Sequence, residues 1–255
     1  MAKSFKALPS VSGERVSPIR RYQDLVIGSR KLRSLIGYEL VQIFSSWVPG
    51  ALGLLLRKKL YPLLLGSCGK GCIFGRNVVL RHPSRIHLSD GVVVDDNVLL
   101  DAKGDDSEGG IFLEKEAFVG RGTILSCKGG RIHLGERANL GFYVEIFTSN
   151  QVSLGADVMV AAYCYLVGGG NYCMNRRDLP MNQQYDYEGK GGIVVEDDVW
   201  LGAHVVVMDG ITLGRGSVLG AGAVVTKSTG AYEIWGGVPA KFLRERPAES
   251  ADASN

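Results

Sequence analysis

The sequence has little excess charge of either sign. Its 255 residues include 29 Lys and Arg against 26 Asp and Glu, which gives a net charge of +3. A chain this balanced does not predict nucleic-acid binding, because that function relies on a strongly basic surface. The length allows one or two domains with an ample core.

Cysteine is scarce and its number is odd. An odd set does not make a disulfide framework, and the first two cysteines, four residues apart, lack the second pair that a zinc site needs. The N-terminus has no signal-peptide pattern. We therefore expect small buried apolar cysteines, no metal, and a reducing compartment such as the cytoplasm. The cysteines are Cys68, Cys72, Cys127, Cys164 and Cys173.

No apolar run is uniform enough to predict a transmembrane helix. Residues 35–56 are strongly apolar, but polar residues and the Pro49-Gly50 pair interrupt them, and a span needs about 20 apolar residues in succession. Basic residues are frequent in residues 1–33 and return in Arg57-Lys-Lys. Two interpretations of the short helices predicted in residues 35–60 stay open. They lie on the inner face of the cytoplasmic membrane, or they only cap the rest of the fold.

Glycine, in contrast, is abundant, and it accompanies a six-residue repeat. Leu213-Gly-Arg-Gly-Ser-Val is followed by Leu219-Gly-Ala-Gly-Ala-Val and then by Val225-Thr-Lys. An aliphatic residue opens each hexad, and a small or β-branched residue stands fifth. A period of six fits neither an α-helix nor a single strand. It fits a coil with three flat faces, each using one hexad, with Gly at the corners.

The hexads group in threes, and each group makes one turn of the coil. The pattern predicts a mainly β fold of about seven turns, each rising by one strand spacing of about 4.8 Å. We expect the first and fifth residues of each hexad to point inward, and the open ends to need caps. The openers, turn by turn, are Cys68/Phe74/Leu80, Leu88/Val94/Leu100, Leu113/Val119/Leu125, Leu134/Leu140/Ile146, Leu154/Val160/Leu166, Val195/Leu201/Val207 and Leu213/Leu219/Val225.

Two segments interrupt the repeat, a polar one at residues 101–110 and a longer one at 168–192. A long loop that leaves a regular scaffold is a common place for functional residues. We expect three parts in the chain: a basic tail and helical segment at 1–66, the coil at 67–246, and a disordered tail at 247–255.

Residues 68–246 resemble the hexapeptide-repeat superfamily of left-handed β-helix acyltransferases, and most closely its galactoside, maltose and polysaccharide O-acetyltransferase branch. The resemblance implies a left-handed parallel β-helix that forms a homotrimer with active sites between neighbouring subunits. It also implies acetyl-CoA as the acyl donor. The motifs that carry it are Val199-Trp-Leu-Gly-Ala-His, Leu219-Gly-Ala-Gly-Ala-Val-Val-Thr-Lys and Trp235-Gly-Gly-Val-Pro-Ala-Lys-Phe-Leu-Arg.

The same resemblance implies a groove for coenzyme A. Backbone groups of Ala203 and Ala221 would contact the pantetheine arm, and Gly222 would let the arm lie close to the coil. A groove of small residues that ends in cations suits a thin, polyanionic cofactor. The alternatives are that the alanines only pack at corners and that the last cations lie on a solvated terminal helix. The residues implied at the adenosine-phosphate end are Thr226, Lys227, Lys241 and Arg244.

The chain departs from the family at Asn171. In the family, a His at the end of this hexad takes the proton from the acceptor hydroxyl. A carboxamide forms hydrogen bonds but does not take a proton, and loss of a general base costs about 10²–10⁴ in rate. Three explanations stay open: an inactivated variant of an ordinary enzyme, an enzyme that uses another base, and a scaffold that binds without turnover.

Other residues near the long loop are candidates for the acceptor site. Glu145 could act as the base or orient one, and Tyr143 and Tyr163 could stack on a sugar ring or pack on a neighbouring subunit. Asp178 and Asp186 could bind acceptor hydroxyls. His204 lies at a corner where we expect a purely structural role.

We therefore predict acetyl transfer from acetyl-CoA to a hydroxyl of a saccharide, which would be lipid-linked if residues 35–60 contact a membrane. One alternative is N-acetylation of an amino sugar carried by a nucleotide, because a neutral amine needs less help from a base. The other alternative is a non-catalytic binding or scaffold protein.

Overall fold

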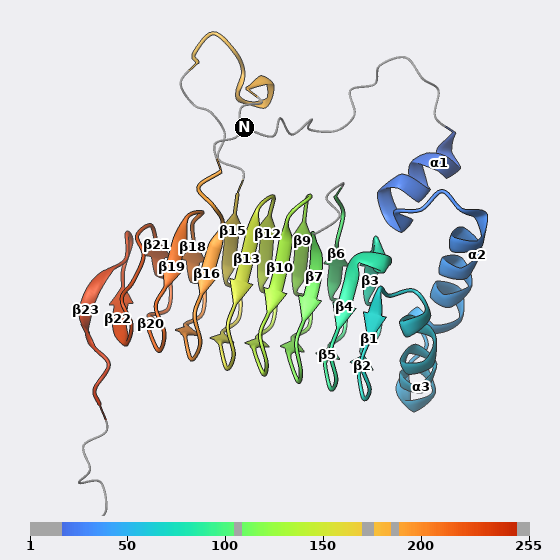
Figure 1. The fold of residues 1–255 in the computed structure, drawn as a ribbon, viewed down its shortest axis with the longest axis horizontal. Helices are drawn as coiled ribbons and strands as arrows, with labels where there is room; N and C mark the ends of the chain where they lie inside the picture. Colours follow the sequence, from blue (N-terminus) through green and yellow to red (C-terminus); the bar gives the residue numbers. More distant parts are fainter. Residues whose placement is uncertain (1–16, 105–108, 170–175, 185–188, 249–255) are drawn as a thin grey trace, which may run out of the picture.

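The computed structural model describes residues 17–104, 109–169, 176–184 and 189–248. In this part of the chain, short strands wind into a three-sided coil with one long parallel sheet on each side (Figure 1). Sheet A contains β1 (Ser67–Cys68), β4 (Ile86–Leu88), β7 (Gly110–Leu113), β10 (Arg131–Leu134), β13 (Gln151–Leu154), β16 (Ile193–Val195) and β19 (Ile211–Leu213).

The other two sides have the same construction. Sheet C contains β3 (Val79–Arg81), β6 (Leu99–Asp101), β9 (Ile124–Cys127), β12 (Glu145–Thr148), β15 (Tyr165–Gly168), β18 (Val206–Val207) and β21 (Val224–Val225). Sheet B contains β2 (Ile73–Phe74), β5 (Val93–Val94), β8 (Phe118–Val119), β11 (Asn139–Leu140), β14 (Met159–Val160), β17 (Trp200–Leu201), β20 (Val218–Leu219), β22 (Glu233–Gly236) and β23 (Lys241–Glu245).

Successive turns stack with the hexad openers in register. Leu134 lies opposite Leu113 on one side and Leu154 on the other, and Leu201 lies opposite Leu219. The described residues form seven complete turns, and β22 begins an eighth by pairing in parallel with β20. The predicted fold class and number of turns are confirmed.

The core is a column of small and aliphatic side chains along the axis of the coil. Openers such as Phe74 and Leu140 and fifth residues such as Val144 and Ala223 are fully buried. Burial of one Leu or Val side chain contributes about 1.5–3 kcal/mol, so the stacked turns stabilise one another. Cys72, Cys127 and Cys164 are buried as expected, Cys68 is only partly buried, and Cys173 lies outside the described residues.

The corners depend less on glycine than the repeat predicts. Gly122 and Gly222 do have a positive φ at the corner between sheets B and C. At the same corner, however, Asn97, Tyr143 and His204 have a positive φ as well. This conformation is unfavourable for residues with a Cβ atom, and the packing of the stacked turns holds them in it.

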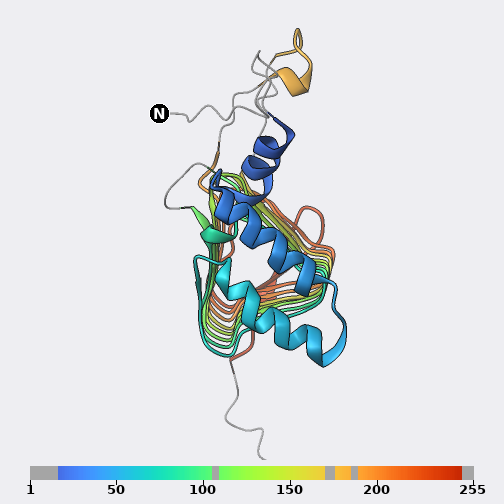
Figure 2. The same cartoon turned by 90° about the vertical axis from the view of Figure 1, so that its right-hand side faces the viewer.

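The helical segment closes the first turn of the coil. Its helices lie across the open triangular end when the coil is viewed along its axis (Figure 2). Among the described residues, no helix is both long enough and apolar enough to cross a membrane. The elements are α1 (Pro18–Tyr22), the π-helical η1 (Gln23–Ile27), α2 (Leu32–Val41), the π-helical η2 (Gln42–Ser46), α3 (Gly50–Leu60) and the 3₁₀ turn η3 (Tyr61–Leu63).

Three polar side chains anchor this helical cap (residues 17–66) to the coil. Tyr38 Oη donates a hydrogen bond to the Leu80 carbonyl at 2.8 Å, and Tyr61 Oη donates one to the Val78 carbonyl at 3.3 Å. Arg57, only 3% exposed, donates from Nε to the Phe74 carbonyl at 2.9 Å. The helices thus cap the first turn of the coil, whereas contact with a membrane, the other interpretation of residues 35–60, stays a prediction.

The opposite end closes with a hairpin. Strand β23 runs antiparallel to β22, with Phe242 opposite Trp235 and Lys241 opposite Gly236. All five residues of β23 are exposed. The alternative that Lys241 and Arg244 lie on a terminal helix is therefore wrong, because the chain turns back to pair with the last parallel strand of sheet B.

The two predicted interruptions are present as excursions between sheets C and A. The first separates β6 from β7, and the second separates β15 from β16 (Figure 1). The longer excursion contains the 3₁₀ turn η5 (Met181–Gln183). A further 3₁₀ turn, η4 (Pro83–Arg85), precedes β4.

Candidate functional site

One corner of the coil, between sheets B and C, gathers most of the predicted site residues. Tyr143, Tyr163, His204 and Gly222 each stand three residues after a hexad opener. The openers are paired in register from turn to turn, so these four residues form one column along the corner. We call it the corner column.

Aromatic rings fill the corner column in turns four to six. The Tyr143 and Tyr163 rings stack with centroids 5.3 Å apart and planes 7° apart. The His204 ring continues the stack, 5.1 Å from Tyr163 and again at 7°. Each such contact contributes about 0.5–1.5 kcal/mol beyond the area it buries. The stack is therefore a preformed column of rings on the outside of the coil, in which both faces of Tyr163 are covered by neighbouring rings.

The corner column ends abruptly at turn seven. A Cβ atom placed on Gly222 would meet no other atom within 4 Å. At Gly122, by contrast, a Cβ atom would lie 2.4 Å from the Tyr143 ring. The space beside Gly222 is thus open, whereas the space beside Gly122 is filled by the ring of the next turn.

In a second column beside the corner column, the side chains become smaller toward turn seven. Phe142 of turn four, which carries Arg121 at 4.4 Å over its ring, is followed by Ala162, Ala203 and Ala221 in the next turns. The Gly222 amide donates to the Ala203 carbonyl at 2.8 Å, so the structure brings Ala203, Ala221 and Gly222 together. Their role in binding the pantetheine arm stays a prediction.

The predicted phosphate-binding residues are not one cluster. Lys241 lies opposite Gly236 near the corner between sheets B and C, and Arg244 lies opposite Ile234, farther along sheet B. Thr226 and Lys227 follow β21 at the other edge of sheet C, four and five residues from Gly222, or about 13–17 Å along an extended chain. All four are exposed. They surround the end of the coil, and nothing in their positions singles out one binding point.

Glu145 lies next to the corner column. It begins β12, directly after the corner, and pairs across the sheet with Tyr165. Burial, and then the negative charge of Glu145, raise the pKa of Tyr165 above its ordinary value. The exposed carboxylate of Glu145 is thus within electrostatic reach of the phenol one turn further along, on the outer face of sheet C.

The long loop supplies the remaining candidates. Asp178 accepts a hydrogen bond from Arg176 Nε at 3.1 Å, and this bond lowers the pKa of the Asp178 carboxyl. The carboxylate is therefore engaged within the loop. Asn171 and Asp186 lie outside the described residues.

The root of this loop is fixed to the coil, but at a different corner. The Thr148 hydroxyl donates to the Gly168 carbonyl, and the Asn150 amide donates to the same carbonyl at 3.3 Å. From Tyr163 to Gly169, the chain follows β15 across the whole of sheet C. That is about 20 Å for six extended residues, so the corner column and the loop root lie far apart in one subunit.

His204 has a ring contact that the sequence did not predict. We expected a structural corner residue, and its ring extends the stack from Tyr163 beside Ala203. The signal was available, because the third residue after the opener is Tyr143, Tyr163 and His204 in successive turns. Comparing that position between turns, rather than along the chain, would have found the stack.

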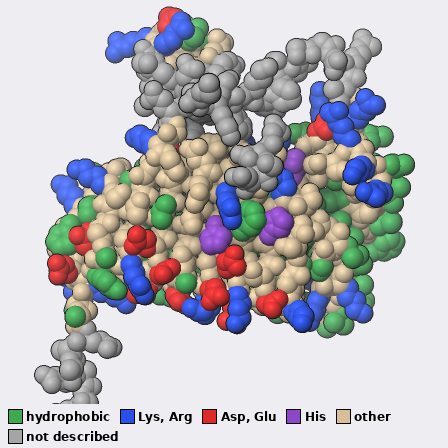
Figure 3. Space-filling model, in the orientation of Figure 1, with side chains coloured by type: hydrophobic (Ala, Val, Ile, Leu, Met, Phe, Trp, Pro, Cys, Tyr) green, Lys and Arg blue, Asp and Glu red, His purple; other side chains and the backbone are tan. Residues whose placement is uncertain are grey.

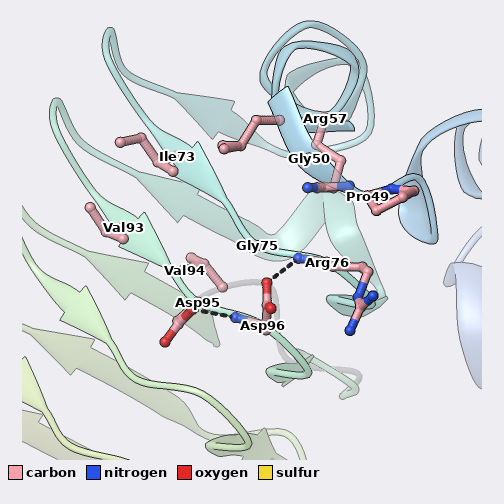
Figure 4. Close-up of a pocket in the computed structure, with 11 residues that line it drawn as sticks. Pro49, Gly50, Arg57, Ile73, Gly75, Arg76, Val93, Val94, Asp95 and Asp96 are labelled. Carbon is pink, nitrogen blue, oxygen red and sulfur yellow. Dashed lines mark hydrogen bonds between the residues drawn. The ribbon is translucent and has the colours of Figure 1, made fainter. Parts of the chain in front are cut away.

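A pocket of about 460 Å³ opens at the other end of the coil, between α3 and the first two turns of sheet B (Figure 4). Apolar residues line most of it, together with Arg57, Arg76, Asp95 and Asp96. The Arg76 amide donates to Asp96 Oδ1 at 2.5 Å. The pocket belongs to the junction with the helical cap and is remote from Ala203 and Ala221. Among the described residues, no group of His, Cys, Asp or Glu could hold a metal ion.

Comparison with known proteins agrees with this architecture. The model of the bacterial transferase hexapeptide family (six repeats) matches residues 192–227. The galactoside O-acetyltransferase of Escherichia coli is 32% identical over 118 residues, which are 46% of this chain and 55% of that protein. A probable acetyltransferase of Mycobacterium tuberculosis is 31% identical over 128 residues, 50% of this chain and 42% of that one. The chain thus spans about half the length of these curated relatives.

Solved structures share the fold. The polySia-specific acetyltransferase NeuO has a TM-score of 0.53 and 20% identity, covering 74% of this chain and 84% of that one. A mutant of AntD, an N-acyltransferase from Bacillus cereus, has a TM-score of 0.51 and 17% identity over 80% and 92%. Fold and repeat together define a hexapeptide-repeat β-solenoid. The chain is similar to the left-handed β-helix superfamily of hexapeptide-repeat acetyltransferases, and residues 192–227 carry its transferase hexapeptide repeat.

Proposed function

We propose that this protein transfers an acetyl group from acetyl-CoA to a hydroxyl group of a saccharide. The observation that carries the proposal is the corner of small residues Ala203, Ala221 and Gly222. It follows directly on a stack of three rings and lies inside the part of the chain that matches the transferase hexapeptide family. A pantetheine arm fits beside small residues, and the face of the His204 ring turned away from Tyr163 is a flat surface on which a sugar can stack.

We also propose that the active unit is a homotrimer. An acyl transfer requires the acceptor oxygen within about 3–3.5 Å of the thioester carbon. In a single subunit, the loop root at Gly169 and the corner column lie about 20 Å apart across sheet C. Packing the loop of one subunit against the corner column of the next would bring the two together. A monomeric mass in analytical ultracentrifugation at micromolar concentration would contradict this arrangement.

The chemistry needs a proton acceptor. The acceptor oxygen attacks the thioester carbon, a C–O bond forms, the C–S bond breaks, and the hydroxyl proton must leave as the CoA thiolate departs. Asn171 cannot take that proton. We propose Glu145, which follows the corner at the start of β12, as a substitute, either directly or through the adjacent phenol of Tyr165.

The cofactor site has a direct test. CoA should raise the midpoint of thermal unfolding of the wild-type protein, and Ala221→Phe should abolish this rise, because the new ring fills the groove. Ala231→Phe is the matched control, since Ala231 is also an exposed corner residue near the end of the coil, but at another corner. Equal protection of both variants by CoA would show that the groove lies elsewhere.

Two further variants separate the explanations for Asn171. An inactivated enzyme should gain about 10²–10⁴ in acetyl-CoA consumption with Asn171→His, measured by thiol release with a panel of glycan acceptors. If the wild type is active and Asn171→His adds nothing, Glu145→Gln should remove a similar factor. A chain that binds CoA but consumes none in any variant is a scaffold, and the proposed transfer reaction is then wrong.

The N-acetyltransferase alternative is favoured by one observation, Asn171 itself. An amino sugar is a nucleophile once its amine is neutral, so the reaction depends less on a general base. Turnover by the wild-type protein with a nucleotide-linked amino sugar, and none with hydroxyl acceptors, would select this alternative. The pH profile would then follow deprotonation of the amine.

A further inference from the structure

The outer face of the helical cap is apolar. Along α2 and η2, five large apolar residues recur at intervals of three or four and are 49–67% exposed. This spacing places them on one side of the helix. They are Leu32, Ile36, Leu40, Ile43 and Trp47.

The inner face of the same helices is also largely apolar, but it packs against the coil. Tyr38 and Val41 are 5% and 6% exposed and pack toward the coil, and Ser45 is fully buried between them and α3. The outer apolar side chains therefore contribute nothing to capping. In α3, Leu52 and Leu55, 64% and 59% exposed, extend the same outward surface. We call these seven outward residues the cap surface.

Cations surround the cap surface. Lys31 and Arg33 lie at the start of α2, Lys31 as its N-cap, and Lys58 and Lys59 lie in the last turn of α3; all four are exposed. Between residues 17 and 66, eight Lys and Arg oppose only two acidic residues. Hydrophobic side chains gather at this end of the molecule, with Lys and Arg side chains beside them (Figure 3).

The two acidic groups offset only a small part of this charge. Asp24 is bound by Arg30 at 2.8 Å, and Glu39 accepts a hydrogen bond from Tyr22 Oη at 2.6 Å. The exposed charge around the cap surface is thus strongly positive. A binding partner for the apolar cap surface and its cations therefore needs anionic groups beside an apolar interior. An anionic bilayer surface has both properties.

We propose that the cap surface docks the protein on an anionic phospholipid membrane. The helices would lie parallel to the membrane plane, with the apolar side chains between the lipid headgroups and with Lys58 and Lys59 against anionic headgroups. Trp47, 63% exposed, is a residue that favours this interface. A protein partner fits less well, because Lys is depleted in protein–protein interfaces. This inference does not depend on the proposed acetyl transfer.

The test is flotation of the full chain with lipid vesicles. We expect binding to phosphatidylcholine vesicles that contain about one-third phosphatidylglycerol, weak binding to phosphatidylcholine alone, and loss of binding as salt screens the charges. The combined variant Ile36→Gln, Ile43→Gln and Trp47→Gln should lower the partition coefficient at least tenfold, to a level near that of the phosphatidylcholine control. The vesicle assay needs no substrate, so failure of the proposed enzyme activity leaves its result unchanged.

A charge-matched pair isolates the electrostatic part. Lys58→Gln with Lys59→Gln should weaken binding about 30-fold, from roughly fivefold for each cation near an anionic surface. Lys115→Gln with Lys128→Gln removes the same charge from exposed positions on the coil and should leave binding within about twofold. Circular dichroism and thermal unfolding check that all variants stay folded.

Three outcomes would overturn the proposal. The first is absence of binding to anionic vesicles, and the second is equal binding by the wild type and the triple variant. The third is a particle mass in solution that falls to half in the triple variant, because the cap surface would then be a contact between two copies of the chain.

Discussion

At one end of the coil, three helices lie across turn one, and at the other end the two strands of the β22–β23 hairpin follow turn seven (Figure 1). The helical end is sealed by buried groups, since Tyr61 is fully buried and Arg57 is 3% exposed. At the hairpin end, by contrast, every residue of β23 is exposed. One end is thus built mainly for stability, and the other leaves its polar side chains accessible.

This difference separates two kinds of residue that look alike in the sequence. Arg57 and Lys241 are both cations beside apolar stretches. Arg57 satisfies the carbonyls of Ser45, Val48 and Phe74, whereas Lys241 only extends along an exposed strand. The same substitution made at each end should therefore have very different costs.

The largest effect should come from removing a tyrosine ring. Tyr61→Ala should destabilise the fold by about 3–5 kcal/mol, because it leaves a cavity under the helical cap and removes an edge contact with Phe74 at 5.3 Å. Tyr232→Ala, at a 48% exposed position at the hairpin end, should cost about 1 kcal/mol or less. Urea unfolding measures both. Equal costs would show that the two ends are equally well packed.

The second largest loss of stability should come from replacing an arginine. Arg57→Met should cost about 2–4 kcal/mol, because three carbonyl groups lose their donor in a buried place. Arg246 also bonds protein groups, donating from Nη1 to Asp198 at 2.9 Å and to the Gly216 carbonyl at 3.2 Å, but its side chain is 41% exposed. Arg246→Met should cost about 0.5–1 kcal/mol. If Arg246→Met costs as much as Arg57→Met, burial does not explain the role of Arg57.

A smaller effect is expected in the coil between the ends. A double-mutant cycle with Tyr163→Ala and His204→Ala should give a coupling free energy of about 0.5–1.5 kcal/mol, because the two rings stack at 5.1 Å. Tyr143 and His204 do not touch the same face of Tyr163, so a cycle between those two should give coupling close to zero. Coupling of equal size in both cycles would mean that the stack responds as one unit.

The smallest effect should be a dependence on pH at the helical end. Burial lowers the pKa of His82 below its ordinary value of 6.5, opposed by the Asp24 carbonyl and the Asp101 carboxylate and assisted by the charges of Lys103 and Arg85. Since the folded pKa is the lower one, stability is full above about pH 6.5. It is lost as the pH falls from there toward the folded pKa.

His82→Asn tests this, because Asn tolerates the left-handed backbone found there, with φ at 51°. The variant should show a flatter dependence of unfolding free energy on pH between about 7 and 5. His204→Asn is the matched control, with φ at 61° in an exposed place. An unchanged slope in His82→Asn would assign the effect to another group.

The coil was predictable because few folds fit a period of six, and because the aliphatic residue that opens each hexad must be buried. Leu140 and Leu201 are interchangeable in that pattern, so one error would not have shifted the register. The capping helices were predictable as apolar helices. Which faces they bury was not, because α2 is apolar on both sides and only contact with turn one selects Tyr38 and Val41 for the interior.

The site was predictable in part. The motif around Leu219 located Ala221 and Gly222, whereas the ring stack depends on contacts between turns that are 20–41 residues apart in sequence. The strand at Lys241 was missed for a similar reason, since its pairing with β22 outweighs any local preference of the segment.

Each turn of the coil adds the same length along its axis. Turn one touches the helical cap and turn seven carries Gly222, so six strand spacings, about 29 Å, separate the two. If the cap surface lies on a bilayer, the number of hexads determines how far from the membrane the corner at Gly222 meets its substrate. Inserting or deleting one turn of three hexads would then increase or decrease that distance by about 4.8 Å without altering any residue at the corner.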